Sequence, residues 1–262
     1  MNTADELLSA GDLGGARAAL IERIRAAPDD EAARMFLFQL MAVCGEWDKA
    51  AVQLRALAQL TPEAQMLAVV YGQALEAEKA RAQVFAGAAP APVLVPSAPW
   101  VEQLAEGLSH LFAGDLEAGE QARKAAFDAA PETPGSWNGE AFGWIADADG
   151  HFGPTFEAIV AGRWGLVPFE AIASLRSEGP RDLRDLVWLP AEMALRSGQS
   201  AAILLPARYA GTEAQASASL RLGRATDWTT SASGDRGLGQ KLLISDRDED
   251  FGLLSLRELR FE

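Results

Sequence analysis

The chain has 262 residues, of which 49% are apolar and 23% are charged, and its formal net charge is −14 at pH 7. This is the composition of a folded globular protein, long enough for one large domain or two ordinary ones. The negative charge argues against binding to nucleic acid or to an anionic membrane surface, since both require clustered Lys and Arg. The single cysteine, Cys44, excludes an internal disulfide and a thiolate zinc cluster.

Neither a leader nor a membrane span is expected. The first residues, "MNTADELLSAGD", carry acids where a secretory signal needs a basic start and an apolar core. The longest apolar stretch, "MFLFQLMAVC" (35–44), is interrupted by Gln39 and has about half the length needed to cross a bilayer. We therefore expect a cytoplasmic location.

A helical unit recurs near the N-terminus at an interval of 34 residues, the period of tetratricopeptide repeats. "GDLGGARAALIERIRAAPDD" and "GEWDKAAVQLRALAQLTPE" match at Gly11 and Gly45, Ala16 and Ala50, Leu20 and Leu54, and Pro28 and Pro62. The prolines are expected to end the second helix of each pair. A third copy, "GDLEAGEQARKAAFDAAPE", begins at Gly114, which predicts a degenerate unit in between.

Apolar residues at three- and four-residue spacing predict a series of helices. The expected helices cover residues 13–27, 32–43, 47–57, 65–85, 100–112 and 116–130. The segment "GAAPAPVLVPSAPW" (87–100) interrupts them, because four prolines in ten residues cannot lie inside a helix. We expect an extended connection there, with Val93, Leu94, Val95 and Trp100 buried.

After Pro131, short apolar runs alternate with Gly, Ser, Asp and Pro. Such runs predict an antiparallel, strand-rich region with one or two helices. The predicted fold class is therefore α+β. It has a tetratricopeptide-like helical-repeat domain over residues 1–134 and a smaller mixed domain over residues 135–262.

Two acidic segments resemble the start of a calcium loop. "DADGHFG" begins at Asp147 and "DRDEDFGLLSLR" begins at Asp246. The sixth positions are Phe152 and Phe251 instead of glycine, and the twelfth are Ala158 and Arg257 instead of glutamate. Both segments are interpreted as solvated turns, and no metal site is predicted.

No catalytic motif is recognisable. "GDRGLGQK" (234–241) fits neither the phosphate loop nor the dinucleotide fingerprint and is interpreted as a hairpin or loop. His110 is expected on a helix surface or in packing, and His151 lies in the acidic turn. Cys44, in an apolar helix, is interpreted as a structural thiol. A non-enzymatic protein without a cofactor is predicted.

The strongest signal comes from longer motifs. The stretch "APETPGSWNGEAFGWIADADGHFGPTFEAIVAGRWGLVPFEAI" is followed by "PRDLRDLVWLPAEM", "LLPARYAGTE" and "LGRATDW". Together with "LLSAGDLGGARAAL" and "VFAGAAPAPVL", these resemble, across nearly the whole chain, the ImpE family, also called TagJ, of bacterial type VI secretion accessory proteins. The run "RWGLVPF" is less aromatic than is usual in that family, and His151 stands where a basic or polar residue is expected.

The resemblance implies a helical-repeat domain joined to a smaller mixed domain, working beside the contractile sheath. It also implies binding to a helix near the N-terminus of the sheath small subunit and a link to the AAA+ ATPase that disassembles contracted sheaths. A stack of helix pairs exposes a groove that can take an amphipathic helix.

Several residues in these motifs are candidates for partner contact, although packing is the simpler interpretation for the aromatic ones. The candidates are Phe36, Phe38, Trp47, Trp144, Trp164, Trp188, Arg208 and Tyr209. Four further polar residues are expected to form structural hydrogen bonds or ion pairs: Asp147, Asp149, Arg184 and Asp185.

Two functional classes stay open. An adaptor predicts an apolar groove about as wide as a helix. A hydrolase or metal-dependent enzyme using Asp147, Asp149 and His151 predicts a pocket where these side chains converge with shifted pKa values. A generic repeat scaffold outside secretion would require the motif match to be accidental.

Overall fold

A computed structural model describes residues 3–247 and 250–262. Its α-helices are α1 (Ala4–Ser9), α2 (Leu13–Ala26), α3 (Glu31–Val43), α4 (Trp47–Leu57), α5 (Pro62–Phe85), α6 (Pro99–Ala113), α7 (Leu116–Ala129) and α8 (Ala218–Arg221). Four short 3-10 helices are η1 (Phe169–Ala171), η2 (Leu183–Leu186), η3 (Thr212–Ala214) and η4 (Leu253–Ser255). The α+β class is confirmed. No helix in these residues combines the length and the apolar character needed to cross a membrane.

The strands are β1 (Gly135–Trp137), β2 (Glu140–Phe142), β3 (Ile145–Asp147), β4 (Thr155–Val160), β5 (Arg163–Pro168), β6 (Ile172–Arg176), β7 (Trp188–Leu195), β8 (Ser200–Pro206), β9 (Thr226–Ser231), β10 (Gly234–Gly239), β11 (Leu242–Ser245), β12 (Phe251–Gly252) and β13 (Glu258–Phe261). Eight of them form one antiparallel sheet in the order β2-β1-β13-β6-β7-β8-β4-β5. A small sheet, β12-β11-β3, and the β9–β10 hairpin complete the strand-rich part.

Helices α1 to α5 pack as consecutive neighbours. Asp12 and Asp30 cap α2 and α3, because each side chain accepts a hydrogen bond from a backbone N–H in the first turn. Gly11 and Gly45 adopt positive φ angles of 81° and 69° just before α2 and α4. Glycine enters this region without the steric cost of a side chain, so the repeated glycines mark where the chain reverses between helices.

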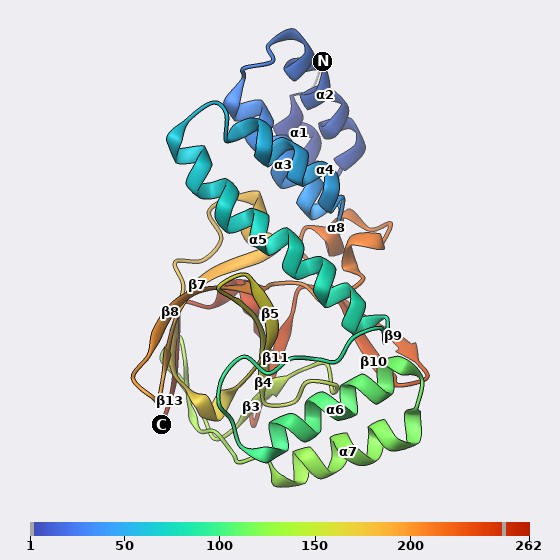
Figure 1. The fold of residues 1–262 in the computed structure, drawn as a ribbon, viewed down its shortest axis with the longest axis vertical. Coiled ribbons are helices and arrows are strands. Elements are labelled where there is room, and N and C mark those ends of the chain that lie inside the picture. The colour runs from blue at the N-terminus through green and yellow to red at the C-terminus, as the bar shows by residue number, and fades with distance from the viewer. Residues whose placement is uncertain (1–2, 248–249) are drawn as a thin grey trace.

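The repeat is less regular than its 34-residue period predicts. Pro62 does not end a helix: it is the first residue of α5, where a missing N–H costs nothing. No degenerate helix pair lies before the third copy. That region holds the single 24-residue helix α5, an extended segment and α6. The third copy forms α7, which packs with α6 at the other end of α5 (Figure 1).

The extended connection is confirmed. Backbone hydrogen bonds join Leu94 N to Leu166 O and Leu166 N to Pro92 O, which adds this segment to the edge of β5. Gly165 makes the approach possible, because a Cβ there would lie 2.5 Å from the Pro92 carbonyl oxygen. Trp100 is buried, whereas Val93, Leu94 and Val95 are only partly covered.

Helix α5 joins the two regions. It runs from the α1–α4 stack, across the curved sheet, to α6 and α7 (Figure 1). The larger core cluster includes side chains from both sides of the predicted boundary, such as Leu75 of α5 with Trp164 and Trp188 of the sheet. A second cluster of buried apolar side chains lies within the curve of the sheet. That residues 1–134 and 135–262 are separate domains stays a prediction.

Candidate partner-binding cleft

A buried ion pair joins α5 to the sheet. Arg81 of α5 donates from Nε to Glu157 Oε1 at 2.6 Å and from Nη2 to Glu157 Oε2 at 2.9 Å. Glu157 lies on β4, and both residues are buried. Two parallel charge-assisted hydrogen bonds fix the distance and the orientation of the two elements.

Further polar groups complete this junction. Lys241 Nζ lies 2.8 Å from Glu157 Oε2 and 2.8 Å from Asp147 Oδ2. Trp164 donates to Glu157 at 3.0 Å, and Trp188 donates to Glu78 of α5 at 2.9 Å. Residues from α5, β3, β4, β5 and β7 therefore share one network, as buried charges require if they are to stay ionised.

The network shifts the acidity of Glu157. Burial alone would raise the pKa of this carboxyl, but the charges of Arg81 and Lys241 outweigh burial and hold the pKa at about 2. For Lys241, burial acts to lower the pKa, and the charges of Asp147 and Glu157 overcome that effect and raise it. Both groups are therefore charged at neutral pH.

Arg208 ties a third segment into the same region. Its Nη1 donates to the carbonyl of Val43 at the end of α3 at 3.0 Å and also to the carbonyl of Arg221. These contacts satisfy carbonyl groups at helix ends, which have no partner inside the helix. Burial lowers the pKa of Arg208 to about 10, so the side chain keeps its charge at neutral pH.

The acidic turn at 147–153 is not solvated, contrary to the prediction. Asp147 accepts a hydrogen bond from the Tyr209 hydroxyl at 3.1 Å and pairs with Lys241. Asp149 accepts from Gly237 N at 3.1 Å and lies 2.6 Å from His151 Nδ1. Tyr209, Gly237 and Lys241 are far from this turn in the sequence, so the local motif does not indicate that they lie beside it. The second acidic segment includes positions 248 and 249, which lie outside the described residues.

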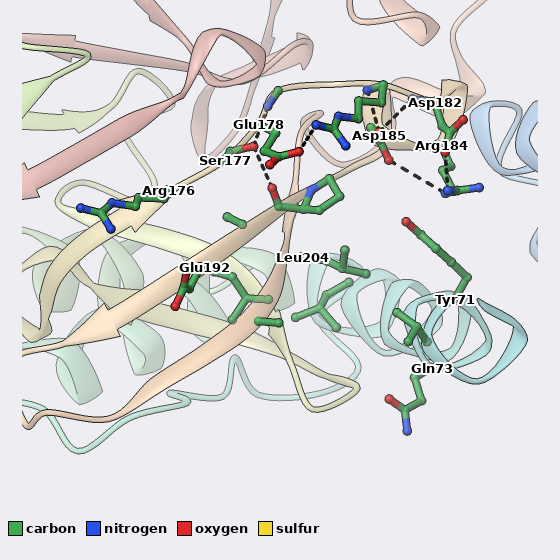
Figure 2. Close-up of a pocket in the computed structure, with 18 of the residues that line it drawn as sticks. Tyr71, Gln73, Arg176, Ser177, Glu178, Asp182, Arg184, Asp185, Glu192 and Leu204 are labelled. Atoms are coloured by element: carbon green, nitrogen blue, oxygen red, sulfur yellow. Dashed lines mark hydrogen bonds and ion pairs between the residues drawn. The ribbon is translucent and has the colours of Figure 1, made fainter. Parts of the chain in front are cut away.

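Beside this junction, a cleft of about 1060 Å³ opens between α5 and the loop at 177–185 (Figure 2). Its base includes the apolar residues Ile159 of β4 and Leu204 of β8, which lie opposite each other on the paired strands. Val70 and Gln73 of α5 line one side. The cleft is open to solvent and apolar at its base, as a site for a peptide or a helix requires.

The opposite wall is held in place by local hydrogen bonds. The Asp185 carboxylate accepts from the backbone N–H groups of Arg181 and Asp182 at 2.8 and 2.9 Å, which caps η2. The Arg184 guanidinium lies 4.9 Å from the centre of the Tyr71 ring and connects the loop to α5. Arg184 and Asp185 also line the cleft, and that their role is structural stays a prediction.

An exposed apolar stripe continues from the cleft along α5. Met66, Val69 and Val70 are 72%, 60% and 45% exposed, and they share one helix face because they are three or four residues apart. Other side chains of α5, such as Tyr71 and Leu75, are buried against the core. A helix apolar on both faces indicates a second contact surface.

None of the eight predicted partner-binding residues is among the residues that line this cleft. Five of the eight are buried: Phe38, Trp164, Trp188, Arg208 and Tyr209. Phe36 and Trp47 are partly buried, and the Trp47 ring packs 5.9 Å from Trp188. Only Trp144 is exposed, at 38%. Of the other residues considered, His110 is on the surface as expected, with its ring Nδ1 3.3 Å from Asp115.

The chain is 44% identical to the type VI secretion system accessory component TagJ of Pseudomonas aeruginosa over 261 residues, which cover 99% of this chain and 91% of that protein. The chain belongs to the ImpE/TagJ family. The family model described as ImpE protein matches residues 139–260. The crystal structure of protein VPA1032 from Vibrio parahaemolyticus has the same fold, with a TM-score of 0.86 and 24% identity over 99% of this chain and 97% of that one.

Membership of the ImpE/TagJ family agrees with the recognised motifs, and the structure gives those motifs a physical role. The residues that carry the resemblance, such as Asp147, Trp164 and Tyr209, form the junction between α5 and the sheet. Within the described residues, no three His, Cys, Asp or Glu side chains are arranged to hold a metal ion.

The sequence interpretation missed the exposed stripe of α5. The helix has apolar residues at 66, 69 and 70 in addition to those that its buried face uses. This excess of apolar residues is the sequence signal for a second contact surface. The cleft base was not predictable, because Ile159 and Leu204 are brought together by strand pairing between β4 and β8.

Proposed function

We propose that this protein is an accessory component of type VI secretion that binds an amphipathic helix in the cleft beside α5, a role that needs no catalytic residue. The observation that carries the proposal is the continuity between the exposed stripe Met66–Val69–Val70 and the apolar base of the cleft. A relative that shares 44% of its residues is named an accessory component of that system, which supports the biological setting.

The shape of the surface suits a helix. One wall is a helix, α5, whose exposed side chains follow a three- and four-residue spacing that a second apolar stripe can match. The base adds apolar residues of the sheet, Ile159 and Leu204, beneath the exposed Val70 of α5. Burial of such side chains gives most of the affinity in helix-in-groove complexes.

Charges around the cleft favour a partner with basic residues beside its apolar stripe. Glu192 lines the cleft, is exposed and forms no ion pair with any described residue. Three of the four arginines that line the cleft are paired with a carboxylate: Arg176 with Glu258, Arg181 with Glu178 and Arg184 with Asp182. The fourth, Arg257, donates to the backbone carbonyls of Leu254 and Leu256. The net charge of −14 adds long-range attraction for a basic segment.

The proposed partner is the helical segment near the N-terminus of the sheath small subunit, in the cytoplasm. A further partner is the AAA+ ATPase that disassembles contracted sheaths. Holding both at once requires a second surface. Trp144 and Ile244, 38% and 37% exposed, lie at the small β12-β11-β3 sheet and supply apolar area for such a contact.

Calorimetric titration with a peptide of that sheath helix tests the proposal. We expect saturable binding near one to one with a negative heat-capacity change from apolar burial. Heats equal to those of dilution, with folded protein and a helix-forming peptide, would remove the main support for the proposal.

A further inference from the structure

We propose that Asp149, His151 and Ser233 form a nucleophilic serine site that hydrolyses small carboxylic esters. The inference is independent of the helix-binding role, which uses a different part of the surface. It revises the enzyme alternative raised from the sequence, because Ser233 takes part and Asp147 does not.

The three side chains have the geometry of a nucleophile, its base and the group that orients the base. His151 Nδ1 lies 2.6 Å from Asp149 Oδ1, and His151 Nε2 lies 3.2 Å from Ser233 Oγ. Because a carboxylate only accepts, Nδ1 carries the proton and Nε2 presents its lone pair to the serine hydroxyl. This is the tautomer that a general base for serine requires.

Hydrogen bonds and packing hold Asp149 and His151 in position. Asp149 Oδ1 also accepts from the backbone N–H of His151 at 3.1 Å, and Oδ2 accepts from Gly237 N at 3.1 Å. Burial acts to raise the pKa of Asp149, but its hydrogen bond and charge interaction with His151 outweigh burial and lower the pKa. The His151 ring is buried and lies 6.0 Å from the Phe112 ring, centre to centre.

A pocket of about 630 Å³ gives access to the serine. Its lining includes both His151 and Ser233, with the partly exposed Trp228 as an apolar wall. Ser233 occupies the two-residue turn between β9 and β10, followed by Gly234 at a φ of 110°. Ser233 therefore lies at the edge of the pocket. A Cβ placed on Gly234 would lie 3.8 Å from His151 Cε1, which is an ordinary contact distance.

Arg123 adds a positive charge to the same pocket. Its guanidinium donates to the carbonyl of Gly150 and pairs with Glu120, while its Nε–H has no acceptor among the described residues. Because this Nε–H is buried and the guanidinium is paired with Glu120, Arg123 holds the pocket wall at Gly150 and is not assigned as a donor to the ester carbonyl oxygen.

The reaction is an acyl transfer in two steps. Ser233 Oγ attacks the ester carbonyl carbon as its proton moves to His151 Nε2, and the alcohol leaves with that proton, which gives an acyl-serine. Water then attacks the acyl carbon, again losing a proton to His151, and the proton returns to Ser233 as the carboxylic acid leaves. No cofactor or redox change is needed.

Labelling with a fluorophosphonate probe tests the site on the full chain. Ser233 Oγ would displace fluoride from phosphorus, with its proton passing to His151, and the phosphonylated peptide is located by mass spectrometry. Hydrolysis of p-nitrophenyl acetate is followed in parallel. The variants are Ser233→Ala, His151→Asn and the matched control Ser231→Ala, whose hydroxyl bonds Ser233 at 3.0 Å but is not in the lining of the pocket.

We expect the label on Ser233 in the native chain and in Ser231→Ala, and none on that peptide in Ser233→Ala. We expect His151→Asn to slow labelling and hydrolysis by on the order of 100-fold or more, the contribution of a general base. Three results would overturn the proposal: labelling of Ser233 no faster than in urea-unfolded protein, hydrolysis unchanged in Ser233→Ala, or rates unchanged in His151→Asn with its fold intact by circular dichroism.

Discussion

Arg81 of α5 and Glu157 of β4 form a bidentate ion pair, with donor–acceptor distances of 2.6 and 2.9 Å, inside the protein. The pair joins segments that are 76 positions apart in the chain. It fixes α5 against the sheet, and α5 is one wall of the proposed binding cleft.

Replacing Glu157 by Gln should destabilise the protein by about 1.5 to 3 kcal/mol, because it removes the charged acceptor of the two hydrogen bonds from Arg81 and leaves Arg81 with Glu78 and Lys241 with Asp147. Urea unfolding followed by circular dichroism measures the change. The matched control is Glu258→Gln, which removes an exposed partner of Arg176 and Arg260 and should change the unfolding midpoint little. Equal midpoint shifts for the two variants would contradict this role of the network.

The same carboxyl predicts a pH dependence. The pKa of Glu157 is about 2 in the folded chain and has an ordinary value of 4.5. A depressed pKa gives stabilisation that is complete above the unfolded value and is lost as the pH falls toward the folded one. The difference in unfolding free energy between the native chain and Glu157→Gln should therefore be constant from pH 7 to about pH 5 and shrink below it. A difference that stays constant down to pH 3 would show that Glu157 is not the responsible group.

Gly165 should tolerate no side chain. A Cβ there would lie 2.5 Å from the Pro92 carbonyl oxygen and 2.8 Å from Leu94 side-chain atoms. Gly165→Ala should cost about 1 to 3 kcal/mol through overpacking, measured by thermal unfolding. Gly72→Ala is the control: it lies in α5 with nothing within 4 Å of a Cβ, and it should stabilise the helix by about 0.5 to 1 kcal/mol. A neutral Gly165→Ala would mean that residues 92–94 do not pair with β5 in solution.

Val70→Asp should weaken binding of the sheath peptide by about tenfold or more without changing the fold, because it places a charge on an apolar contact. Val70 is 45% exposed, so its replacement costs the isolated protein little. Val52→Asp, on α4 and 50% exposed but outside the cleft lining, is the matched control. Calorimetry on the two variants measures the difference, and equal affinities would place the peptide elsewhere.

Much of the fold was predictable because its signals are local. The helix limits follow from spacing and from capping residues such as Asp30, and the proline-rich connection follows from the absence of N–H donors. The prediction of a regular repeat was wrong between the second and third copies. The period predicts a helix pair there, but α5 continues to Phe85 and has its partners in the sheet.

The site was less predictable, because it depends on contacts between distant residues. Trp164 and Tyr209 stand out by type, yet aromatic side chains serve equally in cores and interfaces, and here they are buried. His151 alone does not indicate a site in the sequence, because Ser233, which lies beside it in the structure, is 82 positions away in the chain. Val70 differs from a core valine only in the helix face that it occupies.

The most direct test of the proposed function is hydrogen exchange of the full chain with and without the sheath small subunit, read by mass spectrometry. Binding in the cleft predicts slower exchange in the first half of α5 and in residues 177–185, with no change in α6 and α7. Protection confined to other elements at saturating partner would contradict the placement of the site. Unchanged exchange throughout the chain would contradict binding itself.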